Sequence, residues 1–245
     1  MPPRFLAVIP AYNEEATIGE VARKARRHLD VCVVNDASTD ATAEIARSVE
    51  GVHVISHERN THLARAILDG MRYAVEQDYD FCITLDAGMS HDPDVIPRFQ
   101  SRTDADLVLG VRTTRIGVPL YRRALSWGAA VVVNLVIARR RVPWGGAGLR
   151  DVTSGYRMYS RDALDVLLDA NLQCRAFGFH MEALTVLYRA GARIEEIPIS
   201  YVYSNSSLRA AVVVEGLRGA ARLWKTDPAQ DVRLRKRRAS ASPSQ

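Results

Sequence analysis

The sequence is poor in several features that mark particular classes of protein. It has three cysteines in 245 residues and no Cys-x-x-Cys pair, and aromatic residues make up 7% of the chain. An odd number of cysteines, with Cys32 and Cys82 inside apolar runs, favours buried free thiols over a disulfide framework. Free thiols are typical of a reducing compartment, so we expect a cytoplasmic protein.

Long hydrophobic runs are also missing. The longest apolar stretch covers residues 127–138 and is interrupted by Asn134. This stretch is too short to span a membrane and fits a buried or interfacial helix. The apolar segment after Arg4 is too short to form a signal peptide with its cleavage site. We therefore expect any contact with a membrane to be peripheral.

Charge is present, but not in the arrangement that nucleic acid requires. The formal net charge is +5 and the isoelectric point is about 9.3, which favours anionic partners such as nucleotides or lipid head groups. No basic stretch is interleaved with aromatic residues, as base stacking would need. We expect the protein not to bind nucleic acid.

The chain is long enough for one α/β domain with a substantial core. In its first half, short apolar runs alternate with amphipathic helices, which predicts a mostly parallel central sheet flanked by helices, as in a Rossmann-like fold. The predicted strands cover residues 5–9, 31–34, 52–55, 81–85 and 106–109. The helices between them cover residues 14–29, 63–75 and 93–99, with a further helix capped by Thr39 or Asp40.

The second half is less regular. Residues 120–141 form a predicted amphipathic helix with arginines at both ends. An irregular strand over 151–160 follows, then two short strand signals within 193–203, split by Pro198. Helices are predicted at 162–170, 181–190 and 212–224. Residues 1–226 therefore form a single predicted domain, and residues 227–245 form a basic, disordered tail.

Ligands of parallel α/β sheets bind outside the carboxyl ends of the strands, so the segments after each strand are where chemistry is expected. These segments are rich in polar residues, and two acids, Asp36 and Asp86, each follow a strand. Such acids can hold a ribose, a base edge or a divalent ion on a diphosphate, or can serve as turn and capping residues. The segments cover residues 10–14, 35–42, 57–64, 86–94 and 110–115.

Four motifs resemble those of a known family of enzymes. They are Pro10-Ala-Tyr-Asn-Glu14, Val33-Val-Asn-Asp-Ala-Ser-Thr-Asp-Ala-Thr42, Asp86-Ala-Gly-Met-Ser-His-Asp-Pro93 and Asp151-Val-Thr-Ser-Gly-Tyr-Arg157. In this order and spacing, across residues 4–205, they resemble inverting glycosyltransferases of family 2 with the GT-A fold. The branch that they resemble most is the dolichol- and polyprenyl-phosphate sugar (mannosyl) synthases. The resemblance implies transfer of a sugar from a GDP- or UDP-linked donor to a polyprenyl or dolichyl phosphate.

The resemblance also implies roles for individual residues. Because the acceptor phosphate is already an oxyanion at neutral pH, such an enzyme needs arginines to bring two anions together more than it needs a strong general base. The residues implied to bind the nucleotide-sugar are Pro10, Tyr12, Glu14, Asp36, Asp86 and Arg209. Those implied to bind the acceptor phosphate are Arg112, Arg122, Ser126 and Ser154. Those implied to form the catalytic group are Asp86, Arg112, Asp151 and Arg157.

The chain departs from the family pattern at several positions. Gly88 stands where the second acid of the Asp-x-Asp motif is usual, and Ser90 stands where a glutamine is usual. Asn35 replaces the first of two acids. The segment after Asn60 lacks the usual glycines, and Arg209 alone remains to replace a distal clamp on the diphosphate.

These departures weaken the metal site most. Hard cations depend on charged oxygen ligands, and Asp86 is the metal ligand that the motif retains. His91 and Asp92 lie nearby in sequence and are interpreted as turn and capping residues rather than ligands. We therefore expect Mg²⁺ or Mn²⁺ to be bound weakly or not at all.

Three functions stay open at this point. They are a polyprenyl-phosphate glycosyltransferase, a glycosyltransferase with a glycan or glycolipid acceptor, and a catalytically degenerate relative that binds a nucleotide or a membrane partner. The predicted helix over 120–141 lies either at an anionic membrane surface, with its arginines at the head groups, or in the core. The first function places the protein on the cytoplasmic face of a membrane, with a membrane subunit as a further expected partner.

Overall fold

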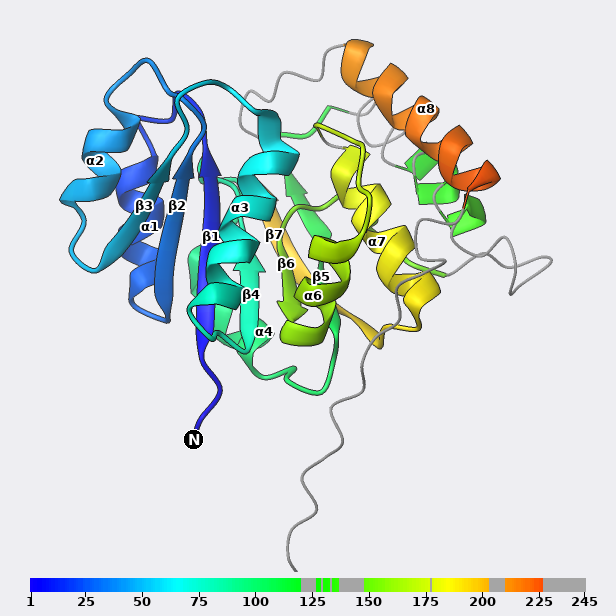
Figure 1. Ribbon diagram of the computed structural model, residues 1–245, viewed down its shortest axis with the longest axis horizontal. Helices are drawn as coiled ribbons and strands as arrows, with labels where there is room; N and C mark the ends of the chain where they lie inside the picture. The colour runs from blue at the N-terminus through cyan, green and yellow to red at the C-terminus, as the bar shows by residue number, and fades with distance from the viewer. Residues whose placement is uncertain are drawn as a thin grey trace, which may run out of the picture.

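The computed structural model of the chain describes residues 1–119, 127–128, 130–132, 134–136, 148–176, 178–202 and 210–226. Its strands are β1 (Phe5–Ala11), β2 (Asp30–Asn35), β3 (Val52–Ser56), β4 (Phe81–Thr84), β5 (Leu107–Ile116), β6 (Arg157–Ser160) and β7 (Ile194–Val202). Its helices are α1 (Ile18–Arg26), α2 (Thr42–Ser48), α3 (His62–Glu76), α4 (Ile96–Gln100), α6 (Arg161–Asp169), α7 (Gly178–Ala190) and α8 (Ala210–Lys225), with a short 3-10 helix, η1 (Pro93–Val95). Strands and helices alternate through the first half, as the apolar pattern predicts (Figure 1).

The strands form a seven-stranded sheet in the order β3-β2-β1-β4-β6-β5-β7. The pairs among β1, β2, β3 and β4 are parallel. β6 is antiparallel to both of its neighbours, while β5 and β7 are parallel to each other. The mostly parallel sheet predicted from the sequence is therefore confirmed. Its carboxyl edge brings together the loops that follow the first four strands.

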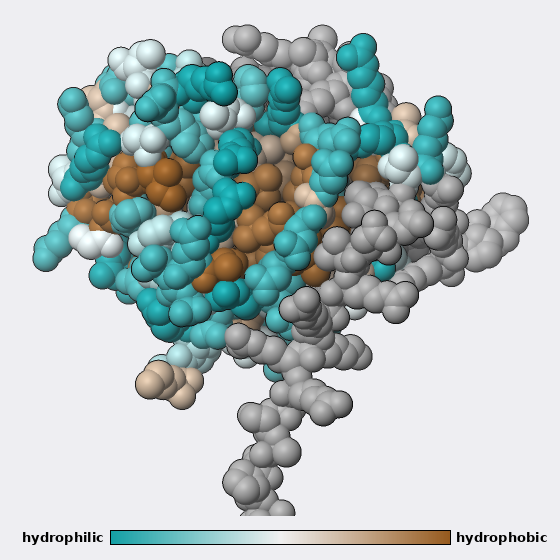
Figure 2. Space-filling model, in the orientation of Figure 1, coloured by the Kyte–Doolittle hydropathy of each residue, from teal (hydrophilic) through white to brown (hydrophobic). Residues whose placement is uncertain are grey.

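Helices cover both faces of the sheet, which explains the continuous apolar runs of its central strands. Along β1, Leu6 and Val8 contribute to a core shared with α3, α6 and α7, whereas Ala7 and Ile9 contribute to a second core shared with α1 and α4. This alternation follows from the two-residue period of a strand. Figure 1 shows α3, α6 and α7 in front of the sheet, and Figure 2 shows hydrophilic side chains around the rim of that face, with hydrophobic ones toward its middle.

The three cysteines are buried and free, as expected from their apolar surroundings. Burial raises the pKa of the Cys32 thiol to about 12, because a thiolate is poorly solvated in the core. Cys32 therefore contributes to packing rather than to reactivity at neutral pH.

Three strands differ in extent from the apolar pattern. β5 continues through residues 110–115, so this segment lies inside a strand rather than after one. β6 is limited to Arg157–Ser160, within the expected 151–160. β7 runs unbroken through Pro198, where the sequence predicts a break. Among the described strands β7 pairs with β5 alone, and an edge strand tolerates proline because one side of its ladder is unpaired.

The described chain ends with α8, which lies beside α7 (Figure 1). Glu182 of α7 is fully buried, forms an ion pair with Arg222 of α8, and accepts the backbone N–H groups of Gln173 (3.0 Å) and Cys174 (2.8 Å). A buried carboxylate is stable only when it is paired and hydrogen-bonded in this way. The cluster therefore ties α8 to the core of the domain.

Two of the predicted segments lie largely outside the described residues. The tail at 227–245 lies wholly outside them, and so do residues 120–126 and 137–141 of the predicted long helix. The described residues between 127 and 136 are helical. Asn134, which interrupts the apolar run, forms two hydrogen bonds with the backbone of Leu149. Its Nδ2 donates to the Leu149 carbonyl oxygen (2.8 Å), and its Oδ1 accepts from the Leu149 N–H (3.0 Å).

The described part of this helix exposes an apolar stripe. Trp127, Val131 and Leu135 follow one another at the i, i+4 spacing of a helix face, and their exposed fractions are 73%, 41% and 56%. Val136, by contrast, is buried. Within the described residues, no helix combines the length and the apolar character needed to cross a bilayer.

Candidate functional site

The loops after β1 and β2 form one wall of the candidate site and are joined by side-chain hydrogen bonds. Glu14 donates its backbone N–H to Thr42 Oγ1 (2.8 Å), and Thr39 donates its backbone N–H to Asn13 Oδ1 (2.9 Å). These bonds connect residues 25 or more positions apart, so each loop fixes the conformation of the other. The segments predicted to carry the chemistry are therefore brought together at the carboxyl edge of β1 and β2.

Backbone strain gathers in the loops along this edge. Asn13, Ala37, His62 and Met89 adopt positive φ angles of 55°, 60°, 70° and 57°. A left-handed conformation costs a non-glycine residue roughly 1–2 kcal/mol, and such strain is concentrated at functional sites. His62 lies where the family usually has glycines, and its positive φ gives the physical reason for that preference.

Asp36 lies at the end of β2 and is almost fully buried. Its Oδ1 accepts hydrogen bonds from His57 Nδ1 (2.8 Å), from the backbone N–H of Thr61 (2.8 Å) and from Thr61 Oγ1 (2.8 Å). Burial alone would raise the pKa of this carboxyl group, but the hydrogen bonds from His57 and Thr61 outweigh it, and the pKa is lowered. Asp36 is therefore an ionised acceptor at neutral pH.

The other residues predicted to contact the nucleotide lie on the same wall. Pro10 is half-buried near the end of β1, and Tyr12 exposes 49% of its surface. Burial raises the pKa of Glu14, and repulsion from Asp86 and Asp40 adds to this effect despite a hydrogen bond from Thr17. Glu14 therefore lies within electrostatic reach of Asp86.

Asp86 follows β4 and has a side chain that is 41% exposed. Its backbone N–H donates to His91 Nδ1 (3.2 Å), and its Oδ2 lies 3.5 Å from the same nitrogen. Because Nδ1 accepts a hydrogen bond, it carries no proton, and burial lowers the pKa of His91. His91 is thus a neutral, buried residue that supports Asp86. The interpretation of His91 as a turn residue did not predict this contact. Asp92 is a capping residue, as expected, and accepts from the Asp94 N–H (3.0 Å).

Arg112 and Asp151 form a buried pair on the β5 side of the site. Arg112 Nε donates to Asp151 Oδ2 and Arg112 Nη2 donates to Oδ1, both at 2.7 Å, while the Arg112 backbone N–H donates to Oδ2 at 3.1 Å. Burial alone would lower the pKa of Arg112, but the carboxylate of Asp151 outweighs it and the pKa is raised. The guanidinium also lies 5.2 Å from the centre of the Tyr201 ring. Asp151 therefore fixes the direction of Arg112.

Two residues implied to be catalytic or to bind phosphate are buried in the polypeptide. Arg157 has no exposed surface, and its guanidinium donates to the carbonyl oxygens of Ser154, His180 and Val152, each at 2.7 Å. Ser154 is 1% exposed, and its Oγ accepts the Tyr156 N–H (3.3 Å). These contacts shape the segment after Asp151, and the catalytic role expected for Arg157 and the phosphate-binding role expected for Ser154 stay predictions.

Arg122, Ser126 and Arg209 lie outside the described residues. The structure therefore does not bear on the acceptor-phosphate role expected for the first two or on the diphosphate role expected for the third. Their assignments stay predictions from the family resemblance.

The described residues around Asp86 offer few ligands for a metal ion. Within the described residues, no group of three or more His, Cys, Asp or Glu side chains could hold a metal ion. Gly88 has no side chain to offer, and Asp92 is engaged in capping. One partly exposed carboxylate, from Asp86, is the ligand that this loop offers. A divalent ion would therefore depend on oxygen ligands from a bound diphosphate.

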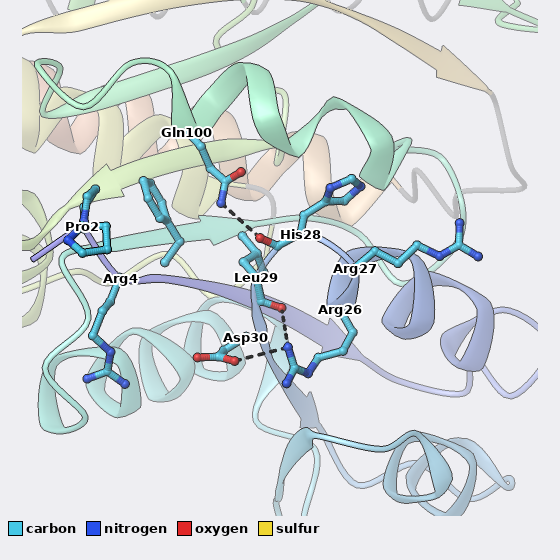
Figure 3. Close-up of a pocket in the computed structure, with 10 residues that line it drawn as sticks. Pro2, Arg4, Arg26, Arg27, His28, Leu29, Asp30 and Gln100 are labelled. Carbon is cyan, nitrogen blue, oxygen red and sulfur yellow. Dashed lines mark hydrogen bonds and ion pairs between the residues drawn. The ribbon is translucent and has the colours of Figure 1, made fainter.

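A separate cavity of about 450 Å³ lies at the opposite, amino-terminal edge of the sheet (Figure 3). Figure 3 shows the amide of Gln100 turned toward the carbonyl oxygen of His28 (3.3 Å), and Arg26 turned toward Leu29 and Asp30. Since Asp30 begins β2, this cavity lies at the other end of the strand from Asp36. It is not part of the candidate site.

The fold and the acids at the carboxyl edge define a glycosyltransferase domain of the GT-A type. The chain belongs to glycosyl transferase family 2, whose family model matches residues 6–168. It is 34% identical to the undecaprenyl-phosphate mannosyltransferase of Micrococcus luteus, over 81% of this chain and 84% of that protein. It is 28% identical to the UDP-N-acetylglucosamine–dolichyl-phosphate N-acetylglucosaminyltransferase of Methanococcus voltae, over 82% of this chain and 86% of that protein.

A solved structure has the same fold. Glucosyl-3-phosphoglycerate synthase from Mycobacterium tuberculosis, in complex with Mn²⁺, uridine diphosphate and glucosyl-3-phosphoglycerate, matches with a TM-score of 0.65 and 19% identity. The match covers 89% of this chain and 80% of that one. The family and fold predicted from the four sequence motifs are thereby confirmed.

Proposed function

We propose that the chain transfers a sugar from a nucleotide-sugar to the phosphate of a polyprenyl lipid at a membrane surface. The observation that carries this proposal is the likeness to polyprenyl-phosphate glycosyltransferases across more than four fifths of each chain. The described site agrees with this proposal, because three suitable groups lie at the carboxyl edge of the sheet. They are the buried acceptor Asp36, the partly exposed carboxylate of Asp86, and Arg112, which is held by Asp151.

The nucleotide binds along the loops after β1 and β2 in this proposal. Asp36 is ionised and accepts an N–H or O–H group of the base or ribose, while Tyr12 provides an exposed aromatic surface. Glu14, whose pKa is raised, borders the same space. Asp86 lies beyond them, where the diphosphate and the sugar would follow the nucleoside.

The acceptor phosphate approaches from the side of Arg112. A phosphate monoester is an oxyanion at neutral pH, so the attacking oxygen needs no strong general base. Arg112 offsets its charge, and Asp151 holds the guanidinium so that no reorganisation is needed as charge shifts to the leaving diphosphate. Asp86 acts on the donor sugar, either directly or together with a weakly held divalent ion.

Membrane contact is proposed for the apolar stripe of Trp127, Val131 and Leu135. Large exposed apolar side chains in one row mark a surface for an apolar partner, and the lipid tail of the acceptor has to be presented from a membrane. Arginines flank this helix in the sequence at both ends, which suits anionic head groups. This arrangement supports a peripheral position on a membrane, and we propose its cytoplasmic face because free thiols are typical of a reducing compartment.

The test is transfer of radiolabelled sugar into lipid. The purified chain is incubated with vesicles that contain polyprenyl phosphate and, in separate reactions, with GDP-mannose, UDP-glucose or UDP-N-acetylglucosamine. We expect label in the organic phase with one donor, and none with Asp86→Asn. Label in a glycan or glycolipid instead would overturn the acceptor assignment. Nucleotide binding without transfer to any acceptor would point to a degenerate relative.

A further inference from the structure

Asp36 is held by an unusual concentration of donors on one of its two oxygens. His57 Nδ1, the Thr61 N–H and the Thr61 hydroxyl all reach Oδ1 at 2.8 Å. Within the described part of the chain, no hydrogen bond reaches Oδ2. Because the two oxygens of a carboxylate move together, three donors on Oδ1 also fix the direction of Oδ2. Oδ2 is therefore the acceptor that remains for a ligand.

His57 connects this carboxylate to helix α3. Its side chain is 12% exposed, and its second nitrogen, Nε2, lies 3.3 Å from Asp69 Oδ2. Asp69 is held in turn by Arg65 Nε (2.8 Å) and by Arg72, both on α3. The backbone N–H of His57 donates to the carbonyl of Asn35 (2.9 Å), directly before Asp36. The imidazole is thus hydrogen-bonded to Asp36 at the end of β2 on one side. On the other side its Nε2 lies at ion-pair distance from Asp69 of α3 and forms no hydrogen bond within the described residues.

We propose that His57 is a positioning residue for nucleotide recognition, which acts by holding Asp36 between the end of β2 and Asp69 of α3. The proposal rests on the proposed function, since it takes the nucleoside part of the donor as the ligand of Asp36. Preorganised acceptors bind more tightly because less conformational freedom is lost on binding. Thr61 keeps two of the donors when His57 is removed, so the effect is smaller than the loss of Asp36 itself.

Three substitutions separate the two contacts of His57. His57→Asn keeps an N–H donor close to the position of Nδ1 but is too short to reach Asp69. His57→Gln places its amide near the position of Nε2 and loses the contact with Asp36. His57→Ala loses both. His53→Asn is the matched control, because His53 lies inside β3 opposite Cys32, away from Asp36, and stacks on Tyr73 (4.2 Å between ring centres).

Binding of UDP and of GDP is measured by titration calorimetry on the full chain. For the nucleotide that binds, we expect the dissociation constant to rise about 10-fold in His57→Ala and His57→Gln, a difference of about 1.4 kcal/mol. We expect it to stay within about 3-fold of wild type in His57→Asn and to be unchanged in His53→Asn. The melting temperatures of all variants are recorded. If His57→Ala destabilises the fold, the dissociation constants of His57→Asn and His57→Gln still test the proposal.

The pH dependence of nucleotide affinity in acid is a second measurement. It would not change if His57 had a purely structural role. His57 is one of the groups that lower the pKa of Asp36. The charged groups on the far side of His57 are Asp69, Arg65 and Arg72. Wild-type affinity should hold until the pH falls below the ordinary range of an aspartate, about pH 4. The fall in nucleotide affinity on acidification, the acid limb, should begin at a higher pH in His57→Ala than in the wild type. In His53→Asn it should begin at the same pH as in the wild type.

The outcomes distinguish this inference from the proposed function. If wild type binds nucleotide and transfers sugar while His57→Ala binds as tightly as wild type, the positioning role is wrong and the function stands. Equal weakening in His57→Asn and His57→Ala, with no movement of the acid limb, would also overturn it. If wild type binds neither nucleotide, the proposed function fails, and this role fails with it.

Discussion

Replacement of Asp151 by asparagine tests whether the Arg112–Asp151 pair organises the site. Asparagine has nearly the same shape, but it lacks the charge and presents an NH₂ group on one side. If its oxygen takes the place of Oδ1, its NH₂ faces Arg112 Nε–H and the Arg112 backbone N–H, which both donate to Oδ2 in the wild type. The substitution therefore removes the charge of Asp151 from beside a largely buried guanidinium.

The magnitude follows from the burial of the pair. Removing one partner of a buried ion pair costs about 3–5 kcal/mol. The side chain of Asp151 is 2% exposed and that of Arg112 is 14% exposed, so water offsets little of the loss. We expect Asp151→Asn to lower the free energy of unfolding by about 3 kcal/mol. With a urea dependence of about 2–3 kcal/mol per molar, the midpoint falls by about 1 M.

The assay is urea unfolding followed by far-ultraviolet circular dichroism, with Glu196→Gln as the control. Glu196 accepts from the backbone N–H and from Nε of Arg150, each at 2.7 Å, next to Asp151 in the sequence. The Arg150 side chain is 63% exposed, however, so this pair should contribute less than about 1 kcal/mol. A loss below about 1 kcal/mol in Asp151→Asn, or equal losses in both variants, would refute the reasoning.

Four further outcomes are expected. Asp36→Ala should weaken binding of the best nucleoside diphosphate at least 10-fold while the fold stays intact by circular dichroism, although the loss of three hydrogen bonds should lower the melting temperature; unaltered calorimetric titrations would reject the assignment. Asp86→Asn should lower kcat about 100-fold or more with little change in KM, because its carboxylate acts mainly in the transition state; a rise in KM at constant kcat would leave Asp86 a binding role alone. Wild-type activity should persist partly in EDTA or need millimolar Mn²⁺, and Gly88→Asp should tighten Mn²⁺ binding in titrations; micromolar affinity in the wild type would show that the site is misplaced. His62→Gly should raise the free energy of unfolding by about 1 kcal/mol in urea unfolding, since glycine relieves the positive φ; a decrease would mean that added chain entropy outweighs the strain.

The sheet and its site edge could be predicted because they depend on local patterns. Buried parallel strands such as β2 and β4 are continuous apolar runs, and the acids that follow them are visible as the end of each run. The full length of β7 is harder to predict, because a proline such as Pro198 normally interrupts a strand. Its tolerance depends on β7 lying at an edge, which is a property of the sheet order and not of the segment.

The supporting residues of the site are harder to find from sequence. His57 contacts an acid 21 positions away, and the contact exists because β2 and β3 pair side by side. The sequence placed His57 in a segment of interest but gave no reason to single it out. His91 is a turn residue by local sequence rules, and its burial cannot be predicted from them because it depends on the rings of Tyr156 and Tyr201 from distant segments.

Arg157 shows the limit of transferring roles by motif. An arginine at the end of an active-site motif suggests contact with an anion, and the resemblance assigned it a catalytic role. The structure surrounds its guanidinium with three carbonyl oxygens and no solvent. A guanidinium buried in this way shapes a loop, which the motif alone does not reveal, and the catalytic role of Arg157 stays a prediction from the resemblance.

The burial and ion pairing of the three site aspartates also indicate which of them can interact with a donor sugar. The charge of Asp151 is offset by Arg112 in direct contact, and Asp36 is almost fully buried beneath its donors. Asp86 is 41% exposed, and the His91 imidazole beside it is neutral at pH 7 because burial lowers the pKa of His91. A neutral histidine does not offset the charge of a carboxylate beside it, whereas Arg112 offsets that of Asp151. Of these three aspartates, Asp86 is therefore the one able to interact with charge that develops on the sugar or with a cation on the diphosphate.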